Sequence, residues 1–295
     1  MRPPDESMEQ EKQARGDEDS VAGLLGPLVP AQALRGAMLF VAAHPDDAVR
    51  GASWLLRRGP SNHVVHVTDG APGDTSSPAA PGAPPPREAQ ARLLEKAAFE
   101  ALSLAGLPSD RLLSLGTAGQ RASLELVTLT ECLVALLKAL RPTLLVVHPY
   151  EGRHPDHDAA AFISHAAVAL LVRGGRTPPT LLEMATSACG NLRPGPNGFL
   201  SALDRWPVAT ATLSEADRST KQRMLACYGS HGEDSYAASR APEHYRLAPR
   251  YDFTRPPREG MMLYGTPTPG MTAVRWRRLA REALEELKLT EASPH

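Results

Sequence analysis

An unbroken apolar segment followed directly by a charged loop constrains the fold of this chain more than any other feature. Residues 36–43 read GAMLFVAA and contain no polar side chain. An apolar run of this length is typical of a parallel strand that is buried on both faces. The loop HPDD at 44–47 follows, and the apolar stretch at 49–56, which ends before a Gly–Pro pair, predicts a helix. A strand, a loop and a helix in this order form the first unit of an α/β sheet.

The same alternation continues along the chain. It predicts further strands at 63–68, 111–115, 143–148, 180–185 and 208–213, and helices at 87–105, 124–140, 159–172, 214–228 and 272–289. Strands separated by helices pair in parallel, so we expect a Rossmann-like α/β fold, a mostly parallel sheet with helices on both faces. Residues 229–257 show no regular pattern and are expected to be irregular.

The polarity of the chain divides it into two parts. Residues 1–35 are expected to be a disordered or loosely packed segment, because the first twenty are polar and acidic and have little to bury. Residues 36–295 are expected to form a single domain with an irregular C-terminal part. Within this domain, residues 71–86 read APGDTSSPAAPGAPPP and predict a surface loop. Its place after a strand makes this loop a candidate lid.

Charge and composition exclude several classes of function. The formal net charge is −1 and the isoelectric point is about 6.8, so no field favours nucleic acid or an anionic membrane. No apolar run has the length of a membrane span, and the polar N-terminus does not resemble a secretory signal. Cys132, Cys189 and Cys227 lack paired spacing, which favours a reducing cytoplasm and argues against a cysteine zinc site. The motifs G-x-G-x-x-G, G-x-S-x-G and H-E-x-x-H are absent.

The first polar cluster, His44, Asp46 and Asp47, lies in the loop after the first strand. An imidazole nitrogen and carboxylate oxygens are ligands that zinc accepts at about 2.0 to 2.2 Å. Adjacent aspartates do not easily point the same way, so one can ligate while the other faces the attacking water. The alternative is structural, with Asp46 or Asp47 serving as the N-cap of the helix that follows.

The second polar cluster, at 148–158, reads HPYEGRHPDHD and holds three histidines and three acids. His154 and His157 are three positions apart, so they share a face if a helix begins there. The alternative is a polar loop capped by Asp156. Both clusters follow strands, and the carboxyl ends of parallel strands meet at one edge of the sheet. Together they predict a zinc site with three protein ligands and an open position.

The sequence resembles the PIG-L or LmbE-like deacetylases. The resemblance rests on VAAHPDD, VTDGAPGD and HPYEGRHPDHDA, and it extends over most of 36–255 through KQRMLACYGSH and APEHYR. It implies an LmbE-like fold and a zinc-dependent N-deacetylase, or amidase, that acts on a small N-acetylglucosamine-type amide. Another divalent transition metal in place of zinc is compatible with the motifs, as is a homo-oligomer.

The resemblance also implies roles for individual residues. His44, Asp47 and His157 match the metal ligands of the family. Asp46 matches the general base that takes a proton from the attacking water. His154 matches the residue that steadies the oxyanion or protonates the leaving amine.

Three further residues complete the expected site. Asp156 would orient one of the two histidines beside it. Arg92 resembles an arginine that reaches substrate hydroxyls, although an ordinary helix ion pair with Glu95 is an alternative. Asp74 is a turn former that is also expected to touch substrate.

The chain departs from the family pattern at three positions. Ala48 stands where a glutamate is usual, Arg50 replaces an apolar residue, and Arg153 replaces a glycine. No implied metal ligand is lost. The missing glutamate motivates an alternative function, a non-catalytic metal- or sugar-binding protein of the same fold.

Overall fold

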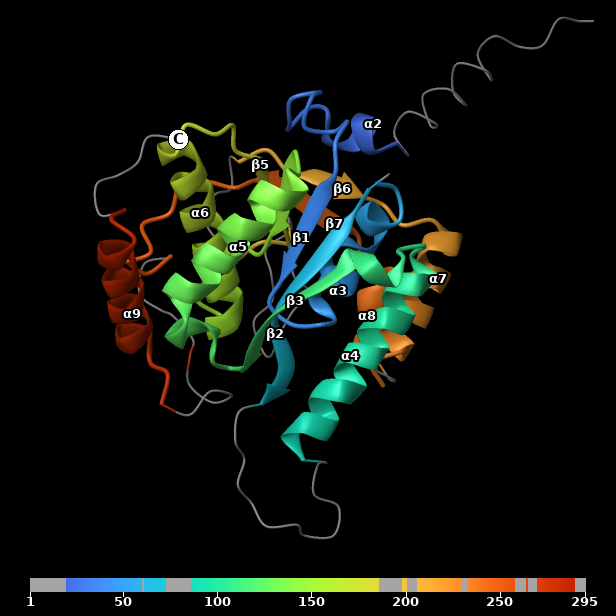
Figure 1. The fold of residues 1–295 in the computed structure, drawn as a ribbon. Coiled ribbons are helices and arrows are strands. Elements are labelled where there is room, and N and C mark those ends of the chain that lie inside the picture. The colour runs from blue at the N-terminus through green and yellow to red at the C-terminus, as the bar shows by residue number, and fades with distance from the viewer. Residues whose placement is uncertain are drawn as a thin grey trace, which may run out of the picture.

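The computed structural model describes residues 20–59, 61–72, 86–185, 198–200, 206–229, 233–257, 264 and 270–289. The core of the molecule is a seven-stranded sheet in the order β3-β2-β1-β4-β5-β7-β6 (Figure 1). Its strands are β1 (Met38–Ala42), β2 (His63–Pro72), β3 (Leu112–Gly119), β4 (Leu144–Val147), β5 (Thr180–Met184), β6 (Ala209–Ala211) and β7 (Glu243–Leu247). The first five strands pair in parallel, and β7 pairs antiparallel to both β5 and β6. The expected mostly parallel, Rossmann-like sheet is confirmed.

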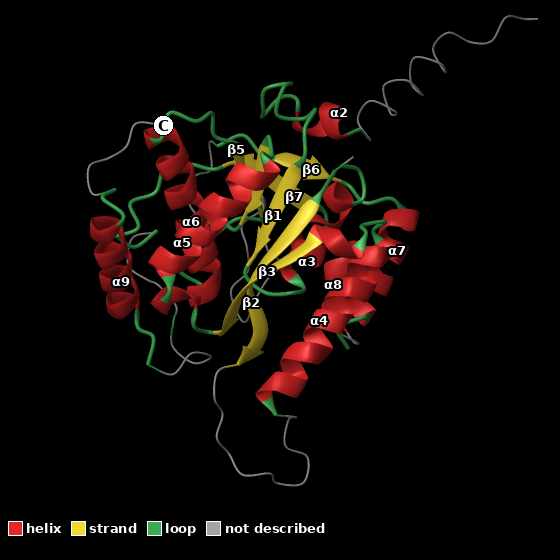
Figure 2. Cartoon of the chain, viewed as in Figure 1, coloured by secondary structure: helices red, strands yellow, loops and turns green. Residues whose placement is uncertain are grey.

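Helices cover both faces of this sheet, as Figure 2 shows. They are α2 (Val21–Leu25), α3 (Asp47–Leu56), α4 (Arg87–Leu104), α5 (Leu126–Leu140), α6 (Pro155–Arg173), α7 (Glu215–Ala226), α8 (Glu233–Arg240) and α9 (Ala273–Glu286). Alternate side chains of β1 point to opposite faces. Val41 belongs to the apolar cluster shared with α5, α6 and α9, whereas Phe40 belongs to the cluster shared with α3, α4 and α7.

The order of the strands creates a topological switch point beside β1. The chain moves from β1 outward to β2 and β3, then returns to place β4 on the other side of β1. The register pairs Met38 with Leu144 and Phe40 with Val146, so the two strands end side by side. In open α/β sheets, ligands bind at such a crevice beyond the carboxyl ends of the strands. The two polar clusters follow these two strands.

The expectation that 229–257 is irregular is wrong, because this segment contains α8 and β7. The sequence of β7, EHYRL, lacks the apolar run or clean alternation that predicts a strand. Its polar side chains are buried as ion pairs instead. Glu243 lies 2.8 Å from Lys221, and Arg246 lies 2.6 Å from Glu183, all four being almost fully buried.

The described part of the N-terminal segment is more ordered than expected. Residues 20–35 include α2, and Leu25, Val29 and Ala33 are buried in the same apolar cluster as Phe40. The looseness predicted for this stretch is therefore wrong, because these spaced apolar side chains have a surface to pack against. Residues 1–19 lie outside the described part of the chain.

Two other expectations concern β2 and the loop that follows it. The strand predicted at 63–68 extends to Pro72, where it pairs with Gly119 of β3. Residues 73–85 of the expected lid lie outside the described residues. No helix in the described ranges is long and apolar enough to span a membrane.

Candidate metal centre

The two polar clusters converge at the switch point because each begins a helix there. α3 begins at Asp47, directly after the loop that follows β1, and α6 begins at Pro155 after β4. The start of α6 is well specified: His154 is the N-cap, Pro155 takes the first turn, and Asp156 and Asp158 place negative charge near the helix N-terminus. Both clusters therefore place side chains at or just before a helix start, beyond the ends of the paired strands β1 and β4.

Three side chains from these helix starts form a compact triangle of donor atoms. His44 Nδ1 lies 3.3 Å from Asp47 Oδ2 and 3.2 Å from His157 Nε2. His157 Nε2 lies 3.4 Å from Asp47 Oδ1. Ligands about 2.1 Å from a tetrahedral zinc ion lie about 3.4 Å from one another. The spacing and the chemistry of the three donors therefore fit such an ion.

Two overlapping sets of side chains at this place also have the spacing of metal ligands. Ligand atoms within 4.8 Å of one another occur in the set His44, His154 and His157 and in the set Asp47, His148 and His157. Neither set contains both His44 and Asp47, and it is the distances above that bring the three implied metal ligands together. The second set adds His148 to their surroundings.

The electrostatics of the triangle suit a cation. Asp47 is only 4% exposed, and burial alone would raise its pKa, but electrostatic interaction with the imidazoles of His157 and His148, and hydrogen bonding with that of His157, hold that pKa well below the usual range. Burial works against protonation of His44, yet hydrogen bonding to Asp156 and Asp47 raises its pKa well above the ordinary value. A buried carboxylate surrounded by imidazoles favours positive charge at this point.

Asp156 contacts the triangle through His44, on the ring nitrogen that faces away from Asp47 and His157. Its Oδ2 lies 3.2 Å from His44 Nε2 and accepts the backbone N–H of Gln120 at 2.6 Å, and its Oδ1 accepts that of Ala122 at 3.2 Å. The resemblance implied that Asp156 orients His154 or His157. The structure places its carboxylate against His44, and only its backbone N–H reaches His154.

Asp46 has a different surrounding from Asp47. It occupies the N-cap position of α3 but makes no side-chain capping hydrogen bond. Its Oδ2 instead accepts from Arg50 Nε at 2.5 Å, and both side chains are partly exposed. Arg50, one of the departures from the family pattern, therefore holds the carboxylate expected to act as base. Tyr228 steadies the same loop through a 2.8 Å hydrogen bond from its hydroxyl to the Pro45 carbonyl.

His154 is held as a neutral ring. Its Nδ1 accepts the backbone N–H of Asp156 at 3.2 Å, and burial lowers its pKa to about 3. A neutral imidazole that accepts at Nδ1 carries its proton on Nε2, and can donate from that atom. The ring lies edge-on to His44, with the centroids 4.7 Å apart.

Arg92 and Asp74 are the two residues expected to contact substrate, and the structure describes only Arg92. Arg92 is exposed on α4, and no ion pair with Glu95 occurs among the described side chains. Asp74 lies outside the described residues. A different arginine at the start of the same helix, Arg87, forms an ion pair with Asp69 of β2.

The remaining departures from the family pattern leave the donor atoms in place. Ala48 is buried in the apolar cluster that contains Phe40. Arg153 Nη1 lies 3.8 Å from Glu151 Oε2, a contact between two mostly buried side chains.

Sequence reasoning did not foresee that two histidines near the triangle are buried. His148 directly follows β4 and is fully buried, while His66 on β2 is 5% exposed. Burial lowers the pKa of each to about 4, so both rings are neutral. The signal for His148 was present in the sequence, because it is the first residue after a buried strand.

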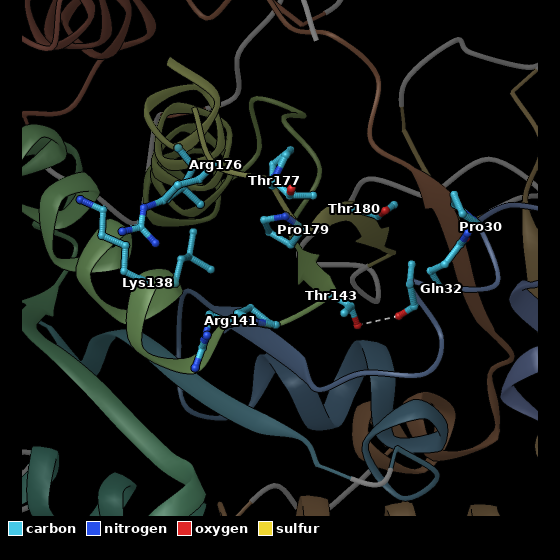
Figure 3. Close-up of a pocket in the computed structure, with 14 residues that line it drawn as sticks. Pro30, Gln32, Lys138, Arg141, Thr143, Arg176, Thr177, Pro179 and Thr180 are labelled. Carbon is cyan, nitrogen blue, oxygen red and sulfur yellow. Dashed lines mark hydrogen bonds between the residues drawn. The ribbon is translucent and has the colours of Figure 1, made fainter. Parts of the chain in front are cut away.

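A separate pocket lies at the opposite ends of the strands (Figure 3). It has a volume of about 490 Å³ and is lined by residues near the starts of β4 and β5, including Thr143 and Thr180. Its cations, Lys138, Arg141 and Arg176, lie at or just beyond the C-terminal ends of α5 and α6, where positive charge offsets the helix carbonyls. This pocket is therefore not the candidate active site.

Comparison with known proteins finds a family that is similar to one segment of the chain. Residues 39–168 match the family model described as PIG-L, GlcNAc-PI de-N-acetylase. The matched residues include both polar clusters, so the resemblance seen in the sequence is confirmed. A search of curated proteins finds no match.

Several solved structures share the fold of this chain. The N,N'-diacetylchitobiose deacetylase from Pyrococcus horikoshii has a TM-score of 0.53 at 15% identity, covering 84% of this chain and 94% of that one. The A40926 pseudoaglycone deacetylase has a TM-score of 0.51 at 17% identity, with coverages of 74% and 99%. The 4-carboxy-2-hydroxymuconate hydratase from Pseudomonas putida KT2440 has a TM-score of 0.50 at 14% identity, with coverages of 73% and 98%. A hydratase shares this fold with deacetylases, so the reaction must be argued from the site.

Proposed function

We propose that this chain is a zinc-dependent hydrolase that removes an N-acyl group, in the first instance acetyl, from a small N-acetylglucosamine-type conjugate. The observation that carries the proposal is the triangle formed by His44, Asp47 and His157, with donor atoms 3.2 to 3.4 Å apart. It lies at the switch point of the sheet, inside the segment that matches the de-N-acetylase family.

The donor set favours zinc over harder cations. Two imidazole nitrogens and one carboxylate suit zinc or another divalent transition metal, whereas calcium and magnesium prefer sites made of oxygen atoms alone. A zinc ion held by these three side chains would supply a Lewis acid for the amide carbonyl and make the attacking water more acidic.

The protein's own groups would manage the proton and the developing charge. Asp46 takes a proton from the water as its oxygen attacks the amide carbon. His154 donates a hydrogen bond from Nε2 to the oxyanion that forms, since its Nδ1 is already occupied by the Asp156 N–H. The C–N bond then breaks, the proton passes to the leaving nitrogen, and a carboxylic acid and a free amine are the products.

The proposed substrate class draws on the deacetylases of N,N'-diacetylchitobiose and of the A40926 pseudoaglycone, which share the fold. Only 5% of the residues are aromatic, which favours a small conjugate over a long polysaccharide that needs a stacking platform. Arg92 and Asp74 are proposed to contact the sugar hydroxyls, and the loop at 71–86 is proposed to close over them.

The alternative function is that of a protein that binds the metal but does not catalyse hydrolysis. The pairing of Asp46 with Arg50 at 2.5 Å favours it, because a carboxylate oxygen that accepts from the guanidinium is less available to the attacking water. In that case the chain would bind a metal or a sugar without hydrolysis.

The test is acetate release from a panel of N-acetylglucosaminides by wild-type protein and by Asp46→Asn, each loaded with zinc. We expect the wild type to release acetate, and the variant to keep its zinc while losing about 10²- to 10⁴-fold in rate, as removal of a general base does. Arg50→Leu is the matched control, since it removes the partner of Asp46 and keeps the base. Zinc-loaded wild type that cleaves no member of the panel would favour the binding protein.

A further inference from the structure

His148 touches two of the proposed ligands, although the reaction described above gives it no part. It follows β4, is fully buried, and lies against both Asp47 and His157. We propose that His148 is a positioning residue of the metal centre, which fixes Asp47 and His157 in the binding geometry without ligating the ion. This inference rests on the proposed metal-binding function.

The first contact fixes the ring of His157. The imidazoles of His148 and His157 stack, with centroids 4.3 Å apart and planes inclined by 28°. His157 is partly exposed, whereas His148 is enclosed in the core, so the buried ring is the rigid member of the pair. Stacking on it restricts the rotation that would move His157 Nε2 away from Asp47.

The second contact concerns the carboxylate. His148 Nε2 lies 3.3 Å from Asp47 Oδ2, the oxygen that also accepts the backbone N–H of His44 at 2.7 Å. Because Nε2 accepts from the Ala43 N–H, this approach is a packing contact and not a hydrogen bond. The buried ring limits the space open to the carboxylate, and the His44 N–H holds it from the other side. Its other oxygen, Oδ1, faces His157.

A hydrogen bond from the backbone argues against His148 as a ligand. Its Nε2 accepts the N–H of Ala43 at 3.0 Å, which occupies the lone pair that a metal would need. The ring is therefore anchored to the end of β1, the strand that leads into the ligand loop. His148 thus ties β1, β4 and α6 together at the site.

The second ring nitrogen of His148, Nδ1, indicates that a histidine is kept at this position for function and not for stability. His148 Nδ1 is buried and has no hydrogen-bond partner among the described residues. Because Nε2 accepts, the proton of the neutral ring is on Nδ1, and leaving a buried donor unpaired is unfavourable. A phenyl ring would fill this space without that penalty but would leave the Ala43 N–H unsatisfied.

Two variants separate the two contributions. His148→Gln places an amide oxygen that can accept from Ala43 and removes the ring, whereas His148→Phe keeps a stacking ring and removes the acceptor. We expect each to weaken zinc binding by about 10- to 100-fold, the usual effect of losing a group that orients a metal ligand. His66→Gln is the matched control, because His66 is also a buried histidine near the site but makes no hydrogen bond or ring contact with the ligands in the described structure.

The measurements are the zinc dissociation constant, the melting temperature of the metal-free protein and the absorption spectrum of the cobalt-substituted protein. We expect weaker zinc binding by both His148 variants, unchanged binding by His66→Gln, and an unchanged cobalt spectrum. Unchanged zinc affinity in folded His148 variants would overturn the proposal, as would a lowered melting temperature without a change in affinity. A cobalt spectrum that shows loss of a nitrogen ligand would make His148 a ligand and also overturn it.

A measurement on the wild type covers the case in which the variants do not fold. Nitrogen-15 NMR of the histidines should show zinc-induced shifts at His44 Nδ1 and His157 Nε2 and no metal-bound shift at His148 Nε2. A metal-bound shift at His148 Nε2 would contradict the proposal. Wild-type protein that holds no zinc at all would remove the proposed function itself, an outcome distinct from intact zinc binding that is insensitive to His148.

Discussion

Asp47 is a nearly buried carboxylate whose two oxygens face three imidazoles, those of His44, His148 and His157. An isolated charge in this position would be costly, and the histidines compensate for it. His154 stands slightly apart from this group, held by the backbone of α6 as a neutral donor. We propose that the first group holds a cation and that His154 hydrogen-bonds to a reacting oxygen.

This division predicts the effect of replacing His154. We expect His154→Ala to keep its zinc and to lose about 10²- to 10³-fold in kcat, because one donor to the oxyanion is removed. Metal analysis and acetate release measured on the same preparation check this. Loss of zinc in this variant would mean that His154 is a ligand, in the set it forms with His44 and His157.

Much of the site was predictable at this scale, because motifs such as HPDD and HPDH name their residues directly. What could not be predicted were contacts between motifs. The carboxylate of Asp156 turns towards His44, 112 positions away in the sequence, rather than towards its neighbours. The stacking of His148 on His157 likewise depends on how the loop between them folds.

The turn after β3 is hydrogen-bonded to the start of α6. Gln120 has a positive φ of 68°, a conformation that is unfavourable outside glycine, and its N–H bonds to Asp156. The same carboxylate reaches Ala122 in the short 3-10 helix η2 (Ala122–Leu124) and His44 in the loop after β1. One side chain therefore links three segments.

We predict that Asp156→Asn weakens zinc binding by about 10- to 100-fold, because His44 loses the carboxylate that orients it. The turn at Gln120 should also exchange its amide hydrogens faster, since an amide group cannot accept equally at both oxygen positions. Zinc titration and hydrogen exchange test the two effects. Unchanged affinity would show that His44 is oriented without Asp156.

The buried ion pair between α7 and β7 gives a prediction about stability. Glu243 accepts from Ser53, from the Trp54 N–H, from Lys221 and from Tyr245, at distances between 2.6 and 2.9 Å. Glu243→Gln should lower the free energy of unfolding by about 3 to 5 kcal/mol, because Lys221 stays buried without its counter-charge. Urea denaturation measures this loss.

An exposed pair provides the control for that experiment. Lys96 and Glu100 lie 3.7 Å apart on the surface of α4, and both are more than half exposed. Glu100→Gln should change the free energy of unfolding by less than about 1 kcal/mol. A comparable loss in the two variants would show that burial does not set the value of the Glu243 pair.

These ion pairs also explain which elements sequence reasoning missed. Apolar strands such as β1 and β4 are recognised by their hydrophobic runs, because burial alone specifies them. β7 carries Glu243 and Arg246 inward, and only partners on other elements, Lys221 and Glu183, make that burial tolerable. No local pattern contains this information.

For the whole molecule, the candidate site joins the loop after β1 to the start of α6 across the centre of the sheet. A metal that binds only the folded state stabilises it by mass action, by about 2.7 kcal/mol when the free ion is at a hundred times its dissociation constant. Removing zinc with a chelator should therefore lower the melting temperature by several degrees, and zinc should restore it. Asp47→Asn should melt at the same temperature with and without zinc; a zinc effect that persists in it would place the ion elsewhere.

The most direct test of the account is to titrate metal-free wild-type protein with zinc while recording acetate release from an N-acetylglucosaminide. We expect the rate to rise with each addition and to level off at about one zinc per chain, as a single three-ligand site requires. Acetate release that is independent of zinc, or absent when the site is full, would contradict it.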